Sequence, residues 1–420
     1  MSTETIITGV PAAEQPSAAD ASFWKNNLRD YGLLVSLLLI MAFFEVVTGG
    51  VLFRGVNVTN LILQNSYIVI MALGMLLVIV GGNIDLSVGS IVGFVGGCAA
   101  ILMVGFHVPW VDIDVKLPWQ LVIVLSLILG GLIGASQGYF IAHSKIPAFI
   151  VTLAGMLIFR GLTGNMLQGQ FVGPFAKGFQ SISAGFIPDF SDFGFLKAPA
   201  GEPQFFWLSM LVGAVGAVLL IYTSTRRWIR DNAQAMETEP FALFVGKNAI
   251  FAILIIGFSY LLASNKGLPN VLIIMGVLIL LYTFVTTRMT IGRRIYAMGG
   301  NRLAAQLSGV RTERLTLLTF VNMGVLAGLA GLIVAARLNS ATPSAGNSFE
   351  LDVIAACFIG GVSASGGVGK VMGVVIGAFF MGVMNNGMSI LGIGIFWQQV
   401  VKGLVLLAAV YVDVYQKSKE

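Results

Sequence analysis

Four ionisable residues lie within apolar stretches of the sequence: Glu45, Asp85, Arg160 and Lys402. A charge inside a hydrocarbon environment is costly, and residues of this kind often serve ion coupling or proton relay. Long side chains can instead reach polar surroundings, Glu45 and Arg160 from helix ends and Lys402 at the cytoplasmic interface. Because such residues are few, ion coupling is kept only as an alternative.

Asp85 differs from the other three because it lies in a glycine-rich stretch that runs from Gly82 to Gly89. Its carboxylate and the Ser87 hydroxyl precede a predicted helix, where either oxygen can accept from free backbone N–H groups and the charge meets the positive dipole end. Capping is one interpretation. The other makes this turn a pivot near a translocation path, formed by Gly82, Asp85, Leu86, Ser87 and Gly89.

Uncharged amides form a third group of polar residues in apolar surroundings. They are Gln64, Asn65, Asn165, Gln168, Asn322, Asn385, Asn386, Gln398 and Gln399. Such groups can hydrogen-bond between helices, or they can line a path for a neutral solute rich in hydroxyl groups. Asn65, Asn385 and Asn386 are our candidates for the path.

A phosphate-binding loop is missing from the sequence. The only candidate, Gly369-Lys370, is followed by Val371 rather than Ser or Thr, and Ala364 stands where a Walker A loop has its first glycine. We therefore expect that the chain does not bind ATP through this motif, and that ATP and magnesium belong to partner subunits.

Histidine and cysteine give no sign of metal or redox chemistry. His107 and His143 have no acidic or cysteine partner at ligand spacing. Cys98 and Cys357 lie in apolar runs and offer neither a zinc spacing nor a disulfide framework. We expect no metal site, no catalytic residue and no cofactor bound by this chain.

The elements that must position these residues are membrane helices. Of 420 residues, 57% are hydrophobic and only 10% charged, which excludes an ordinary soluble protein. The apolar runs have helix length, whereas a membrane barrel would show short alternating strands, so we predict an all-α polytopic bundle of about 10 to 12 transmembrane helices. The segments are about 33–48, 61–81, 86–105, 120–142, 147–165, 205–224, 249–263, 269–286, 316–336, 351–367, 371–387 and 389–412. Those that start near 86, 147 and 351 are short or broken by glycine and suggest half-helices or re-entrant pieces.

Basic residues orient the bundle. With a cytoplasmic N-terminus, the outside loops hold only Arg54, Lys116, Lys177, Lys197, Lys266 and Arg337, and most other Lys and Arg residues lie inside. The predicted organisation is a disordered cytoplasmic tail (1–30), one transmembrane domain (31–415) and a cytoplasmic C-terminal tail (416–420). The net charge of +5 is therefore assigned to topology rather than to nucleic-acid binding.

Two long connections stand out. Residues 166–204 are predicted to be an external loop with short amphipathic elements. Residues 287–315 form a cytoplasmic loop rich in arginine, in which Leu303, Leu307 and Val310 follow a helical pattern suited to the membrane surface.

A weak internal similarity relates the stretch from Gly81 to Gly89 to the stretch from Gly360 to Gly369. In the predicted topology, each follows an inward-running helix and precedes an outward-running one. Duplicated halves would suit a transporter, but glycine-rich turns also recur by chance.

The stretch from Gly82 to Ser90 resembles a signature of bacterial ABC-importer sugar permeases, the group that includes ribose, xylose and multiple-monosaccharide systems. Four further stretches resemble the same family, in the family's order. They are 146–153, 292–301, 304–310 and 350–369. The resemblance extends from about residue 60 to residue 400.

The resemblance implies a multi-pass permease of the bacterial inner membrane. It implies a homodimer that receives a monosaccharide from a periplasmic binding protein and is driven by separate cytoplasmic ATPase subunits. It also implies that the coupling segment that docks on the ATPase contains Gly299, Gly300, Asn301, Arg302, Ala304, Ala305, Leu307, Ser308 and Gly309. Alternatively, this segment is a surface helix held by anionic membrane lipid.

The sequence departs from the family pattern at two places. Leu303 stands where many ABC permeases have an acid before paired alanines, and Asn83 interrupts what is often a Gly-Ile-Asp stretch. An additional helix pair at about 226–268 points toward the xylose or multiple-monosaccharide branch. The alternatives are an ion-coupled secondary carrier and an ABC permease for branched-chain amino acids.

Overall fold

The computed structural model describes residues 18–105, 116–199, 203–234 and 240–417. Its elements are α1 (Ala18–Val47), α2 (Gly55–Val80), α3 (Val88–Val104), α4 (Trp119–Ala142), α5 (Ala148–Leu167), α6 (Lys177–Ala184), the short 3₁₀ helix η1 (Phe190–Phe193), α7 (Trp207–Ala233), α8 (Phe241–Ala263), α9 (Asn270–Arg288), α10 (Thr290–Gly300), α11 (Arg302–Leu307), α12 (Thr312–Leu338), α13 (Phe349–Ile359), α14 (Val371–Ile390) and α15 (Ile395–Lys417). The predicted all-α bundle is confirmed.

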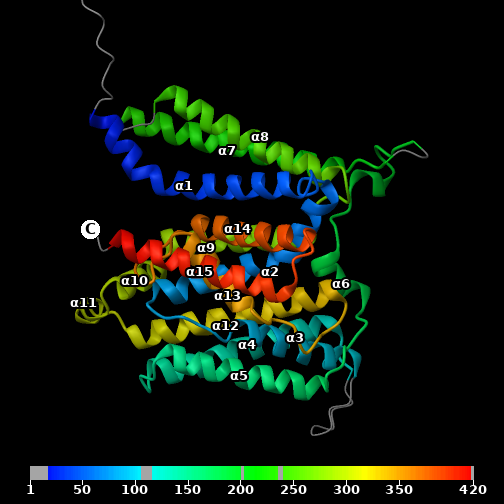
Figure 1. The fold of residues 1–420 in the computed structure, drawn as a ribbon, viewed down its shortest axis with the longest axis vertical. Coiled ribbons are helices and arrows are strands. Elements are labelled where there is room, and N and C mark those ends of the chain that lie inside the picture. The colour runs from blue at the N-terminus through cyan, green and yellow to red at the C-terminus, as the bar shows by residue number, and fades with distance from the viewer. Residues whose placement is uncertain (1–17, 106–115, 200–202, 235–239, 418–420) are drawn as a thin grey trace, which may run out of the picture.

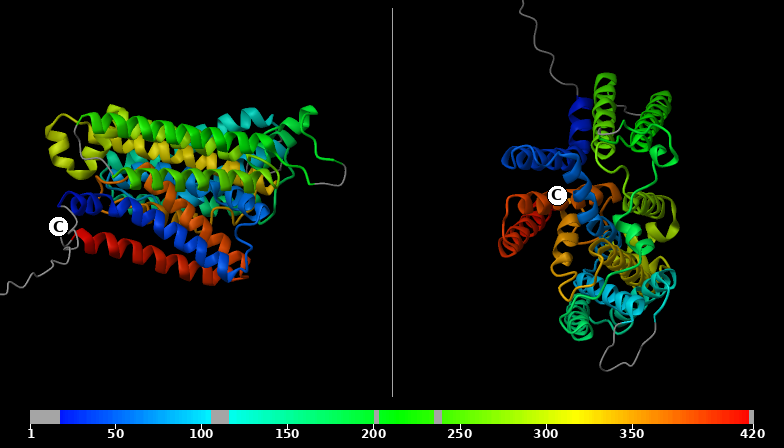
Figure 2. Two further views of the ribbon diagram at one scale, coloured as in Figure 1. Left: turned by 90° about the horizontal axis from the view of Figure 1, so that it is seen from above. Right: turned by 90° about the vertical axis from the view of Figure 1, so that its right-hand side faces the viewer.

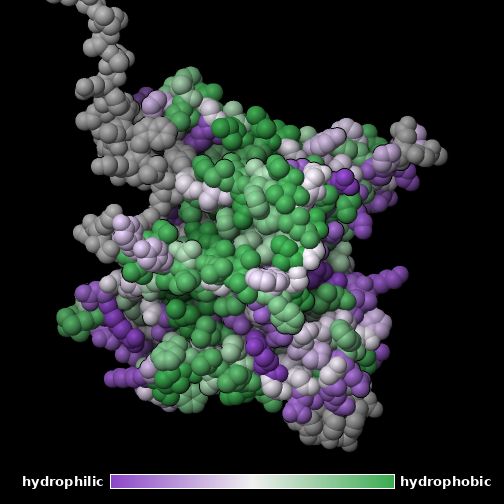
Figure 3. All heavy atoms as spheres, in the orientation of Figure 1, coloured by the Kyte–Doolittle hydropathy of each residue, from purple (hydrophilic) through white to green (hydrophobic). Residues whose placement is uncertain are grey.

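The long helices lie side by side and run between two ends of the molecule (Figures 1 and 2). One end holds the start of α1, the end of α15, and α10 and α11, and is called the termini end. The opposite end, called the loop end, holds α6 and η1. On the face seen in Figure 3, apolar side chains cover the middle, and polar ones gather toward both ends.

Nine helices in the described part of the chain are long and apolar enough to cross a membrane. Two shorter apolar helices, Gly32–Val47 within α1 and Val88–Val104, add to them. Each of the twelve predicted segments falls on a helix. The segment at 351–367 forms only the short helix α13, as its glycines suggested, whereas α5 is uninterrupted, contrary to prediction.

The tails and the extra pair differ in part from their predicted bounds. α1 already begins at Ala18, so the predicted disordered tail is helical over 18–30, and residues 1–17 lie outside the described part. α15 continues to Lys417, beyond the predicted start of the C-terminal tail. The region 226–268 contains the end of α7 and all of α8, which pack against each other.

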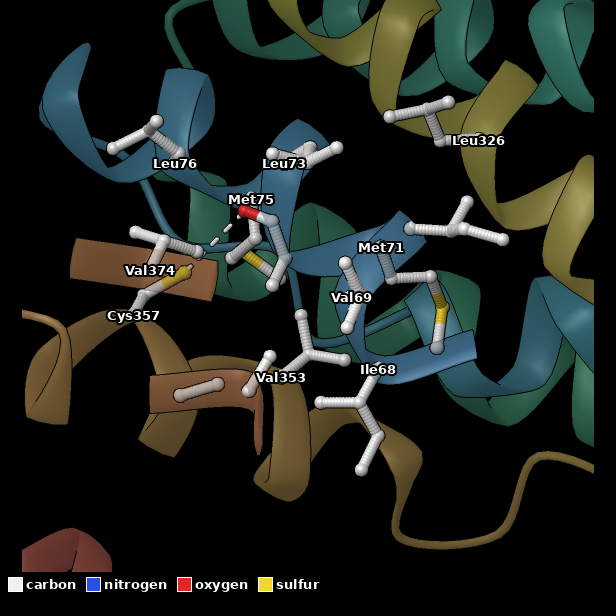
Figure 4. Packing of buried hydrophobic residues seen from close by; sticks show 14 of the residues in the cluster. Ile68, Val69, Met71, Leu73, Met75, Leu76, Leu326, Val353, Cys357 and Val374 are labelled. Atoms are coloured by element: carbon white, nitrogen blue, oxygen red, sulfur yellow. Dashed lines mark hydrogen bonds between the residues drawn. The ribbon is translucent and has the colours of Figure 1, made fainter. Parts of the chain in front are cut away.

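The central helix is α2, with most of its length enclosed by other helices. Ile68, Met71 and Leu73 are fully buried against side chains from α12, α13 and α14, as the close view in Figure 4 shows. The Cys357 thiol on α13 lies 3.6 Å from the Ala72 carbonyl oxygen on α2. Both cysteines are free, and Cys357 serves as a small buried side chain.

Helices α4 and α12 touch through glycine. A Cβ added at Gly130 or Gly134 would collide with the backbone of α12, and one added at Gly324 would collide with α4. Spacing of small residues by four places them on one helix face and lets backbones approach closely in a membrane. These glycines therefore serve tight packing of α4 against α12.

Candidate functional site

The proposed coupling segment forms two short helices at the termini end. α10 buries Ile295 and Met298. The side-chain oxygen of Asn301 then accepts a hydrogen bond from the Ala304 N–H at 2.9 Å and starts α11. The segment is therefore two helices with a break at Asn301.

A turn at Gly309 ends α11. Gly309 has a φ of +79°, a conformation that glycine adopts easily, and the next residue, Val310, donates to the Ala305 carbonyl oxygen at 3.0 Å. Leu303 and Leu307 point outward, with 66% and 83% of their surface exposed. The predicted pattern through Val310 was wrong in one respect, because the helix stops at Leu307.

The inner end of α10 rests directly on two other backbones. Gly299 lies so close to Val80 at the end of α2 and to Gly367 after α13 that a Cβ at position 299 would overlap both. Gly367 donates its N–H to the Val80 carbonyl oxygen at 2.9 Å. The Tyr296 hydroxyl donates to the Gly369 carbonyl oxygen at 2.8 Å. The segment proposed for coupling thus contacts both glycine-rich turns, and this meeting point is called the hub.

The two turns share one hydrogen-bond pattern. After α2, residues 81, 82 and 83 donate to the carbonyl oxygens of residues 77, 79 and 78; after α13, residues 360, 361 and 362 donate to those of 356, 358 and 357. Gly82 and Gly361 both have a φ of +80°. The similarity seen in the sequence is therefore a repeated helix ending.

Asp85 is buried in the first of these turns. Its carboxylate accepts from the Ser87 N–H at 2.8 Å and from the Ser87 hydroxyl at 2.6 Å. The amide nitrogen of Gln137 on α4 donates to the same hydroxyl at 3.0 Å. Burial raises the pKa of Asp85 to about 6, although the hydrogen bonds from Ser87 act in the opposite direction. Asp85 thus accepts from the N–H of Ser87, the residue that precedes α3, whereas the Ser87 side chain makes no capping hydrogen bond to α3; the contact with Gln137 ties the turn to α4.

The other members of this motif also lie at helix contacts. Leu86 is partly buried against the main core. Gly89, on the first turn of α3, lies against the Glu350 carboxylate and the Gly346 carbonyl oxygen, where a Cβ would collide. The motif therefore contacts the first turn of α13.

Two ion pairs hold the first turn of α13. The Lys402 ammonium on α15 lies 2.9 Å from Asp352 Oδ1 and 3.0 Å from Oδ2, and the Tyr67 hydroxyl donates to Oδ2 at 3.2 Å. The Asp352 side chain is fully buried. Arg160 on α5 lies 3.4 Å from Glu350. Both carboxylates also lie at the positive end of the α13 dipole, which favours negative charge.

Residues 57–410 match the protein family described as branched-chain amino acid transport system / permease component. The chain belongs to this permease family. Among its relatives, the xylose transport system permease protein XylH of Escherichia coli (strain K12) is 39% identical over 92% of both chains. XylH of Haemophilus influenzae is 38% identical over 94% of this chain and 98% of its own. The ribose import permease protein RbsC of Haemophilus influenzae is 32% identical over 92% of this chain and 93% of its own. No solved structure matches the chain.

The three amides proposed for the path of this permease lie in different settings. Asn386 exchanges two hydrogen bonds with Asn57 on α2, at 2.9 and 3.1 Å. Asn65 donates to the Leu61 carbonyl oxygen of its own helix at 2.9 Å. Asn385 lies within hydrogen-bonding reach of the Asp352 carboxylate. Asn386 thus makes the interhelical bond of the alternative interpretation, Asn65 bonds within its own helix, and Asn385 joins the buried charges.

The ionisable residues of the permease have partners that the sequence did not indicate. In one of the two interpretations, Arg160 and Lys402 reach the membrane boundary, but in the structure they pair with Glu350 and Asp352. Glu45 accepts from the Phe53 N–H at 3.0 Å in the connection to α2. The two acids of α13 and Tyr67 were missed as candidates. A signal was present, because Asp352 is the second residue of the apolar segment predicted at 351–367 and Glu350 directly precedes it.

Proposed function

We propose that this chain is the membrane permease subunit of an ATP-driven importer for a monosaccharide, most specifically a pentose such as xylose. The observation that carries the proposal is its 39% identity to a xylose permease over 92% of both chains. The match to a ribose permease extends over the same share of this chain at lower identity. A branched-chain amino acid is less favoured, because these sugar permeases match nearly the whole chain.

Separate subunits supply the energy and the sugar in this proposal. ATP and magnesium bind to a cytoplasmic ATPase, a periplasmic binding protein delivers the sugar, and a second copy of the permease completes the path. The termini end faces the cytoplasm, as the excess of Lys and Arg in its loops indicates. In this orientation, α10 and α11 face the cytoplasmic ATPase.

The geometry of α10 and α11 supports docking of the ATPase there. Leu303 and Leu307 offer exposed apolar side chains suited to a groove on a partner, and the arginines around them suit an acidic rim. Behind this surface, Gly299 touches the two turns that end α2 and α13. A displacement of α10 would therefore act directly on helices deep in the bundle.

The charged groups give little support to an ion-coupled carrier. Such a carrier needs titratable groups that gain and lose ions along a path. Within the described residues, Arg160 and Lys402 are each paired with an acid, and Glu45, in the last turn of α1, accepts a hydrogen bond from the Phe53 N–H.

Uptake into proteoliposomes tests the proposal. Labelled xylose, ribose and leucine are offered to vesicles that contain the permease, with and without a cognate ATPase and a cognate binding protein. We expect xylose uptake only when ATP and both partners are present, with excess unlabelled xylose but not leucine as a competitor. Uptake by the permease alone under a proton or sodium gradient would refute the proposal, and preferential leucine uptake would refute the substrate class.

A further inference from the structure

A cleft of about 360 Å³ opens between α10 and the start of α12. Its lining is Thr290, Ile291, Arg294, Gly309, Val310, Arg311, Arg314, Leu315 and Leu318. Three arginines therefore meet at one cleft that also has apolar walls.

The arginines of the cleft form no ion pair with the described residues of this chain. Arg294, Arg311 and Arg314 are exposed, and none forms an ion pair in the part of the chain that the structure describes. The neighbouring acid, Glu313, lies 3.4 Å from the amide of Gln306. The three cations are therefore available to an anion from outside the chain.

The depth of the cleft favours a lipid as the source of that anion. Arg288 ends the membrane span of α9 just before α10, and the cleft extends to Leu318, in the second turn of the α12 span. Leu318 is 37% exposed and Ile291 is half-buried. A phosphate would thus meet the arginines while its acyl chains follow the apolar wall into the bilayer.

A partner protein fits the neighbouring surface better than the cleft. The most exposed apolar side chains of the region are Leu303 and Leu307, and α11 contributes no residue to the cleft. The cleft lies behind this surface, nearer to the membrane spans.

We propose that Arg294, Arg311 and Arg314 form a binding site for the phosphate headgroup of an anionic phospholipid of the cytoplasmic leaflet. The orientation rests on the proposed function, but the binding site does not. Occupancy would hold α10 against α12 next to the hub.

Titration of the purified full-length permease in detergent tests the site. The probes are short-chain phosphatidylglycerol, phosphatidylcholine of the same chain length, and inorganic phosphate, and binding is read by calorimetry. We expect phosphatidylglycerol to bind at least 10-fold more tightly than the other two. The affinity of the triple variant R294Q/R311Q/R314Q for phosphatidylglycerol should be about 100-fold lower, because each arginine near a lipid headgroup contributes about 5-fold in affinity, or about 1 kcal/mol.

The matched control removes three arginines from the end of α7. R226Q/R227Q/R230Q carries the same change in charge far from the cleft and should bind phosphatidylglycerol like the wild type. Thermal midpoints of both triple variants check folding, and single substitutions should each cost about 5-fold. Equal affinity of the wild type and R294Q/R311Q/R314Q for phosphatidylglycerol would overturn the proposed lipid site, even if that variant no longer bound the ATPase. Inorganic phosphate binding as tightly as the lipid would overturn the lipid assignment. Neither outcome depends on sugar transport.

Discussion

The ion pair between Lys402 and Asp352 gives the sharpest prediction for this permease. At 2.9 Å and an effective dielectric constant of 20, the attraction between the charges is about 6 kcal/mol. Lys402→Met removes the cation, and the fully buried Asp352 then keeps the Tyr67 hydroxyl at 3.2 Å and the Asn385 amide as partners. Loss of one partner from a buried pair costs about 3–5 kcal/mol, because it strands the other charge.

A double-mutant cycle separates this cost from general damage. K402M, D352N and K402M/D352N are unfolded by SDS titration in mixed micelles, and tryptophan fluorescence reports the free energy of unfolding. We expect K402M to lose about 3–5 kcal/mol and the double variant to recover most of that loss, because it leaves no unpaired charge.

The exposed pair between Arg230 and Asp231 serves as the matched control. Its atoms lie 3.1 Å apart, but the Arg230 side chain is 65% exposed, so R230M should cost at most about 1 kcal/mol. A loss below 1 kcal/mol for K402M would refute the reasoning. So would a double variant that loses the sum of the two single losses, because the charges would then not be coupled.

Three further predictions concern the termini end. Gly299→Ala should lower the free energy of SDS unfolding by about 1–3 kcal/mol and abolish ATP-driven uptake, because its Cβ would overlap Val80 and Gly367. The Cβ of Gly300→Ala meets open space, so this variant should retain stability and uptake. Equal stability and uptake in the two variants would refute the role of the hub. Gly309→Ala should lower the free energy of unfolding by about 1 kcal/mol and uncouple ATPase activity from sugar, because the φ of residue 309 is +79°. Gly164→Ala, whose Cβ meets open space on a helix, should leave coupling unchanged. Unchanged sugar-dependent ATPase activity in Gly309→Ala would contradict this prediction. Asp85 binds its proton more tightly in the folded protein, with a pKa of about 6 against 3.8, so the free energy of unfolding should fall by about 3 kcal/mol as pH rises from about 4 to about 6. Asp85→Asn should flatten that profile. A wild-type profile without this fall would contradict the raised pKa of Asp85.

Much of the fold could be predicted because the membrane restricts the chain to helices. Each predicted apolar segment contains a helix, and the glycines within the segment that starts near 351 correctly indicated a short one. The end of α11 was harder to place, since Leu303, Leu307 and Val310 continue a helical spacing. The left-handed turn at Gly309 stops that helix, and its cause is local backbone geometry rather than hydrophobic pattern.

Most pairings in the candidate site could not be predicted. Asn57 and Asn386 are 329 positions apart, and Tyr67 and Asp352 are 285 apart. Which buried polar groups meet depends on how the helices pack, and spacing along the chain carries no information about it. Residue type alone therefore identified Asn386 as a polar group in an apolar helix but could not separate a pore-lining role from an interhelical bond.

The short helix α13 links the two parts of the site through backbone contacts. At its first end, Gly89 and Gly346 approach so closely that either Cβ would collide with the other backbone. At its other end, Gly367 meets Gly299 in the hub. Side chains between two helices can adjust their rotamers and absorb a small shift, but two backbones in contact must move together or separate. The glycines of this permease therefore join α10, through backbone contacts, to the turn that follows the helix carrying Glu350 and Asp352.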